Sequence, residues 1–119
     1  MIVSHMANRI TPGLDTLFQA LADPTRRAVI ARLGRGPAPV KELAGPHDMA
    51  LPSFLKHLDM LERSGLVRSR KSGRVRVCTL HPEAFAVADA WIAQQKQLWE
   101  GRIDRMAALA EELERKEME

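Results

Sequence analysis

Apolar residues recur every three or four positions in several stretches of the chain, and this period predicts amphipathic helices. The clearest stretch spans 51–63, where Ser53, Lys56 and Arg63 fall on the side opposite the apolar one. Ser64-Gly65 follows as a stop signal. This segment is therefore predicted to be a helix with one buried side and one polar, partly basic side. Its inward residues are expected to be Leu51, Phe54, Leu58 and Leu61.

Two further helices are predicted near the start of the chain. A short helix covers 14–21, with apolar residues at every third or fourth position. Asp23-Pro24 supplies an N-cap and a first-turn proline for a helix over 24–33, which Gly34 ends. The inward residues of this second helix are expected to be Ala28, Val29, Ile30 and Leu33.

A short and a very long helix bring the predicted number to five. A turn at 36–39 precedes a helix of little more than one turn at 40–44. The longest helix extends from Glu83 to about Glu114, with apolar residues at helical steps throughout. At about 1.5 Å per residue it is about 45 Å long, more than so small a domain can cover. We therefore expect a second subunit to bury the remainder of its apolar side.

Between the fourth and fifth helices, two segments alternate as strands do. Leu66–Lys71 and Arg74–Leu80 flank Ser72-Gly73, which is the pattern of a β-hairpin. The predicted fold class is thus mainly α with a small β-hairpin. A length of 119 residues with 45% hydrophobic content suits one domain. We expect a flexible segment at 1–13, one domain over 14–114 and a frayed tail at 115–119.

The charges are distributed unevenly, although the net charge is only +3. Residues 1–82 carry 13 Lys or Arg against six Asp or Glu, whereas residues 83–119 carry five against nine, giving +7 and −4. Between residues 63 and 82 there are six cations and no acid. A polyanion is the natural partner of such a local field. A helix followed at once by a basic hairpin is typical of DNA recognition.

The cations of the hairpin are the strongest functional candidates. An alternative is that they only guard an exposed edge strand against aggregation. Their position beside the 51–63 helix favours contacts with DNA phosphates, and Arg63 is a weaker candidate than the hairpin residues. The side chain of Arg74, near the tip of the hairpin, is expected to enter a narrow minor groove of the DNA. The predicted hairpin contacts are Arg68, Arg70, Lys71, Arg74 and Arg76.

The composition argues against several other classes of protein. Cys78 is the only cysteine, so an intrachain disulfide and a thiolate cluster are excluded, and a reducing cytoplasm is the expected location. No run reaches the roughly 18 apolar residues that a membrane span needs. The chain has no nucleophile elbow and no phosphate-binding loop. We therefore predict a protein that is not an enzyme and has no cofactor.

Four sequence blocks together resemble the arsenic-repressor (ArsR) family of dimeric bacterial transcriptional regulators. They are LADPTRRAVIARL (21–33), KELA (41–44), LPSFLKHLDMLERSGLV (51–67) and RKSGR (70–74). The resemblance implies a winged helix-turn-helix fold, in which the hairpin is the wing. It also implies a homodimer formed by the first and last helices, with two recognition helices in successive major grooves. The residues assigned to the dimer interface are Leu14, Leu17, Phe18, Trp91, Leu98, Trp99, Ile103 and Met106.

The resemblance also assigns DNA contacts to the front of the 51–63 helix, although three positions depart from the family pattern. Ala50 stands where the family usually has a Ser or Thr cap, and Asp59 stands where a basic residue is more usual. Leu55 replaces a hydroxyl that commonly touches DNA, so it can offer only an apolar contact to a thymine methyl. His57 suits either a DNA contact or a packed core position. The assigned positions are Pro52, Ser53, Leu55, Lys56 and His57.

Metal sensing, a known property of the family, is not expected in this chain. Family sensors carry paired cysteines near the short helix, or Asp and His ligands along the last helix, and this chain has neither set. The main prediction is a homodimeric repressor that binds an inverted repeat in double-stranded DNA through the helix at 51–63 and the wing at 66–80. Two alternatives stay open: a protein-interaction module, and a metal-responsive repressor with a site between subunits. The sequence also leaves open whether a small molecule, a thiol event or the protein level controls release.

Overall fold

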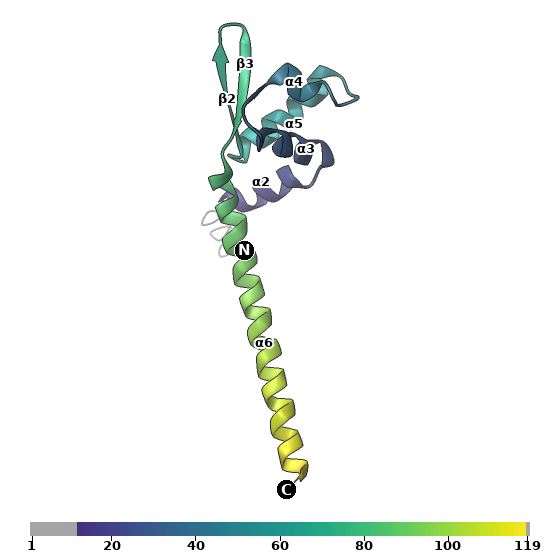
Figure 1. Ribbon diagram of the computed structural model, residues 1–119, viewed down its shortest axis with the longest axis vertical. Coiled ribbons are helices and arrows are strands. Elements are labelled where there is room, and N and C mark those ends of the chain that lie inside the picture. Colours follow the sequence, from purple (N-terminus) through teal and green to yellow (C-terminus); the bar gives the residue numbers. More distant parts are fainter. Residues whose placement is uncertain (1–11, 119) are drawn as a thin grey trace, which may run out of the picture. The chain divides into compact units, whose positions relative to one another are not determined.

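The computed structural model describes residues 12–118 and divides the chain into two compact units (Figure 1). Unit 1 is Met1–Ala88, described from residue 12, and contains four α-helices, three strands and one short 3-10 helix. Unit 2 is Asp89–Glu119, described to residue 118, and consists of helix α6 except for its first three residues, which belong to unit 1. The predicted flexible segment at 1–13 lies outside the described residues except for Pro12 and Gly13, which are already helical.

Four of the five predicted helices lie in unit 1. Helix α2 begins two residues earlier than expected, because a proline suits the first helical position. Helix α5 begins and ends at the predicted residues. Ala50 is its N-cap and makes no side-chain cap hydrogen bond, as the sequence indicated. The four helices are α2 (Pro12–Leu21), α3 (Pro24–Leu33), α4 (Val40–Ala44) and α5 (Leu51–Arg63).

The core of unit 1 lies where α5 packs against α2, α3 and the sheet. Three of the four residues expected to face inward from α5 are buried, namely Phe54, Leu58 and Leu61. Leu51 was wrongly placed in this core: it is 54% exposed, because it lines an open groove at the first turn of α5. In α3, Val29 and Leu33 are buried and Ile30 is partly buried, but Ala28 is exposed, contrary to the prediction.

The sheet has three strands rather than the two predicted. Strands β2 (Val67–Ser72) and β3 (Val75–Leu80) form the expected antiparallel hairpin. The additional strand β1 (Ala38–Pro39) pairs with the other side of β3, in the order β1-β3-β2. The sequence predicted a turn here, since a two-residue strand has no alternation to detect. A proline is compatible with β1 because it is an edge strand.

The loop of the hairpin is Gly73-Arg74, one residue later than predicted. Ser72 and Val75 are directly opposed, so only two residues connect the strands. Gly73 has a φ of 66°, in the left-handed region that glycine adopts without strain. Glycine at the first loop position is the signature of a type II′ hairpin. This geometry places Arg74 at the tip of the wing.

The predicted N-cap of α3 is confirmed. Asp23 has extended backbone angles, and its carboxylate accepts a hydrogen bond of 3.1 Å from the Arg26 amide. Asp23→Ala is expected to lower the free energy of unfolding by about 1 kcal/mol, because the amide loses its partner. Denaturant unfolding at fixed protein concentration measures this change. Asp23→Asn, which can cap equally well, should retain nearly full stability, and an equal loss in both variants would contradict the capping role.

The last helix begins later and ends later than expected. Residues Pro82–Phe85 form a 3-10 helix, and α6 spans Ala86–Met118, past the predicted end at Glu114. Within residues 12–118, no helix combines the length and the apolar character required to cross a membrane.

Candidate nucleic-acid interface

The front of α5 exposes four of the five residues predicted to contact DNA. At about 100° per residue, Lys56 projects from the side of the helix opposite its buried residues. Leu55 is 36% exposed and lies on the flank of α5 nearer the wing. The structure thus brings these four side chains to one solvent-facing surface. They are Pro52, Ser53, Leu55 and Lys56.

His57, the fifth candidate, is placed differently. It is half-buried, and its Nδ1 lies 2.9 Å from Nη1 of Arg26 and 3.7 Å from Oδ2 of Asp23. The Arg26 guanidinium also donates to the carbonyls of Ala20 and Gln19. Burial acts to raise the pKa of Asp23, but the Arg26 amide hydrogen bond and neighbouring charges outweigh it and hold that pKa below its usual value. His57 therefore belongs to a network that joins α5 to the start of α3.

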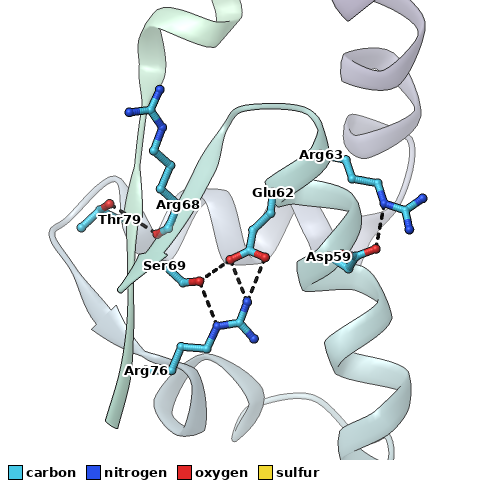
Figure 2. A network of polar contacts seen from close by, with 7 residues as sticks. All are labelled: Asp59, Glu62, Arg63, Arg68, Ser69, Arg76 and Thr79. Atoms are coloured by element: carbon cyan, nitrogen blue, oxygen red, sulfur yellow. Dashed lines mark hydrogen bonds and ion pairs between the residues drawn. The ribbon is translucent and has the colours of Figure 1, made fainter. Parts of the chain in front are cut away.

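Arg76, predicted as a DNA contact, is held within the protein instead. Its Nη2 lies 2.8 Å from both carboxylate oxygens of Glu62, and its Nε donates to Ser69 Oγ at 2.9 Å. The Ser69 hydroxyl also donates to Glu62. Figure 2 shows the three side chains converging between the wing and α5, while Arg68 extends away from them. Arg76 thus ties the wing to the recognition helix.

The remaining wing cations are exposed and divide between the two faces of the hairpin. Arg68 and Arg70 share one face, because side chains alternate along a strand. Lys71 is opposite Arg76 on the face that also carries Ser69, and Arg74 lies in the loop. Among residues 12–118, Arg70, Lys71 and Arg74 have no acidic partner within ion-pair distance. These three side chains are therefore available to form ion pairs with a bound anion.

The negative charge of Asp59 is partly balanced on the surface of α5. Its carboxylate lies 2.9 Å from Nε of Arg63, one turn later, and both side chains are well exposed (Figure 2). Exposed pairs of this kind contribute little to stability. Arg63 is therefore engaged in a local ion pair.

A groove separates the first turn of α5 from the wing, and no pattern in the sequence indicated it. Its volume is about 830 Å³, and its walls come from α4, α5 and β3. Leu51 and Leu55 lie on one wall, and Arg74 and Val75 lie on the other. Only the tertiary contact between helix and wing creates this surface, so no local pattern could have predicted it. Its lining also includes Val40, Lys41, Met49 and Arg76.

Cys78 lies in the core rather than at a reactive surface. It is fully buried between β1 and β2, and burial raises the pKa of its thiol, despite the opposing charge of Arg76. Since the thiolate is the nucleophilic form, this environment lowers its reactivity. Among the described residues there is no group of three or more His, Cys, Asp or Glu that could hold a metal ion. His5 lies outside those residues.

Helix α6 carries a continuous apolar side. Ile92, Trp99, Met106 and Leu113 are spaced by seven residues, the repeat of a helix that packs along another helix. The large apolar residues of α6 are between 40% and 88% exposed. A single helix cannot bury such a stripe by itself. The stripe contains the predicted interface residues Trp91, Leu98, Trp99, Ile103 and Met106.

The interface residues predicted on the first helix are not equivalent. Leu17 is only 1% exposed and packs in the core of unit 1, so it is unavailable to a partner subunit, contrary to the prediction. Burial follows from its position on the side of α2 that faces α5. Leu14 and Phe18 are half-buried. Phe18 packs against the core, and Ala20, which no sequence pattern indicated, is fully buried.

Comparison with known proteins identifies the same architecture elsewhere. A family model described as a helix-turn-helix domain matches residues 21–70. The HTH-type transcriptional regulator Rv2034 of Mycobacterium tuberculosis is 43% identical over 72 residues, which are 60% of this chain and 67% of that protein. The arsenical resistance operon repressor of Escherichia coli is 32% identical over 88 residues, which span 69% of this chain and 75% of that protein.

Solved structures agree with these sequence matches. The crystal structure of an ArsR family transcriptional regulator, RHA00566, is 60% identical and superposes with a TM-score of 0.72, covering 75% of this chain and 92% of that one. The homodimeric winged helix-turn-helix DNA-binding domain of Mb0332 from Mycobacterium bovis is 22% identical, with a TM-score of 0.60. The match covers 77% of this chain and 87% of that one. The second comparison concerns the fold alone.

Proposed function

Because the chain belongs to the ArsR family of winged helix-turn-helix transcriptional regulators, we propose that it is a homodimeric repressor of an inverted-repeat operator. Occupation of promoter DNA would then block access by polymerase. The observation that carries this proposal is a group of exposed wing cations, Arg70, Lys71 and Arg74, that have no acidic partner within residues 12–118 and lie beside the exposed front of α5. Such a surface is complementary to DNA in charge and in shape.

The proposed contacts differ from the set predicted by sequence in two residues. His57 and Arg76 are left out, because their side chains are already engaged within the protein. Base contacts are assigned to the exposed front of α5 and phosphate contacts to the wing. Arg74, at the tip of the wing, is proposed to enter the minor groove. The set is Pro52, Ser53, Leu55 and Lys56 from α5, and Arg68, Arg70, Lys71 and Arg74 from the wing.

The proposed partner for the apolar stripe of α6 is α6 of a second copy. The solved domain of Mb0332 from Mycobacterium bovis is homodimeric, which supports this choice. A two-fold dimer presents two recognition helices, and these read two half-sites about one turn of DNA apart. Burial of the stripe also removes a large apolar surface from water.

Arg74→Ala and Arg70→Ala test the DNA-binding role of the wing. Each variant should bind the promoter fragment more weakly, and the slope of log affinity against log salt should flatten by about one per lost phosphate contact in each protomer. Fluorescence anisotropy over a salt series measures both quantities. Arg35→Ala removes one exposed positive charge outside the wing and α5, so its slope should be unchanged. Unaltered binding by both wing variants would show that the wing assignment is wrong.

A further inference from the structure

The groove between α5 and the wing gathers apolar side chains that face solvent. Within residues 12–88, four large apolar side chains are exposed, and three of them line this groove: Leu51 (54%), Leu55 (36%) and Val75 (48%). The fourth, Val87, lies at the start of α6. Exposed apolar residues are common singly, but a cluster in a groove marks a contact surface. The groove therefore offers a surface suited to an apolar group of a ligand.

The surroundings of the cluster indicate what carries that group. Arg74 and Lys41 line the same groove, so it favours a ligand that carries negative charge beside an apolar group. Leu51 and Leu55 also belong to the first turns of the helix that we propose enters the major groove. A major groove combines phosphates at its edges with the C5-methyl group of thymine on its floor. No other base pair feature of unmodified DNA is apolar in this way.

We propose that Leu51 and Leu55 form an apolar contact site for thymine methyl groups, with Val75 as its opposite wall. The three side chains have neither donors nor acceptors, so they cannot read the hydrogen-bonding edges of bases. They can distinguish thymine from cytosine by the methyl group alone. Leu51, Leu55 and Val75 are thus specificity-determining residues within the proposed operator contact, and this assignment rests on the proposed function.

Replacement of operator thymines by deoxyuridine tests the methyl contact directly, because uracil differs from thymine only by the absent methyl. The operator is first selected from genomic DNA with the full-length dimer. Each thymine is then replaced in turn, and affinity is measured by fluorescence anisotropy. At one or two positions per half-site, wild-type affinity should fall about fourfold per methyl, as expected for burying one such group. Elsewhere the replacement should have no effect.

Side-chain variants connect the effect to the groove. Leu51→Ala and Leu55→Ala should bind the thymine operator more weakly, with the ratio of thymine to uracil affinity reduced towards one at the sensitive positions. Val75→Ala should reduce the same ratio. Lys56→Ala is the matched control, since it should weaken binding to both DNAs equally and keep the ratio. All four side chains are exposed, so unchanged melting temperatures are expected and verify folding.

The possible failures are distinguishable. If wild-type protein selects no DNA at all, the proposed function itself is wrong. If it binds an operator but every thymine tolerates uracil, the proposed function stands and the methyl site is refuted. A ratio that persists in Leu51→Ala and Leu55→Ala would also refute it, because some other group would then read the methyl.

Discussion

Leu58→Ala is expected to lower the free energy of unfolding by about 2–5 kcal/mol. Leu58 is 1% exposed and lies at the centre of the core that joins α5 to the rest of unit 1. Its truncation removes apolar contacts and leaves a cavity that the surrounding residues fill only in part. Denaturant unfolding followed by circular dichroism measures the loss. All proteins should be compared at one concentration, since dimerisation makes apparent stability concentration-dependent.

Lys56→Ala is the matched control for this experiment. Lys56 is exposed on the opposite side of the same helix, so its removal should scarcely change stability. It should instead weaken DNA binding, whereas the folded fraction of Leu58→Ala should keep its DNA-contacting side chains. The reverse pattern, with Lys56→Ala unstable and Leu58→Ala harmless, would mean that the buried and exposed sides of α5 had been interchanged.

A double substitution in the apolar stripe of α6, Trp99→Glu with Met106→Glu, is expected to produce a monomer. Both side chains are largely exposed in the single chain, at 63% and 70%, so the monomer itself should tolerate the charges. In a dimer the same charges would be buried and mutually repelling. Operator affinity should fall by about 10²–10⁴-fold, because each half-site must then be bound independently. Light scattering after gel filtration and fluorescence anisotropy measure the two effects.

Gln97→Glu with Ala108→Glu is the charge-matched control for the stripe. At about 100° per residue these two positions lie on the side of α6 opposite Trp99 and Met106. This variant should remain dimeric and bind the operator normally. A dimeric mass for the stripe variant, or a monomeric mass for the control, would refute the assignment of the stripe to the subunit interface.

The helical elements were predictable because their signals are local. The three- and four-residue spacing of Phe54, Leu58 and Leu61 follows from the geometry of a helix, whatever the rest of the chain does. The Asp23-Pro24 start is equally local, since the cap and the amide that it binds are three residues apart. Strand β1 was missed for the opposite reason. It exists only because Ala38 meets Cys78, a residue forty positions away.

The candidate DNA-binding site also combines features that are local in the sequence with features that depend on tertiary contacts. Sequence alone determined that six cations without acids occur at the end of a helix with a polar side and in the hairpin after it, which is enough to indicate a polyanion. Tertiary structure decided which of those cations remain available. Glu62 of α5 meets Arg76 across the hairpin, whereas Arg70 and Arg74 meet no acid among the described residues. Such pairing depends on strand register and on helix packing, because these bring together residues that are distant in sequence. The grouping of Leu51 and Leu55 with Val75 depends on the same contacts.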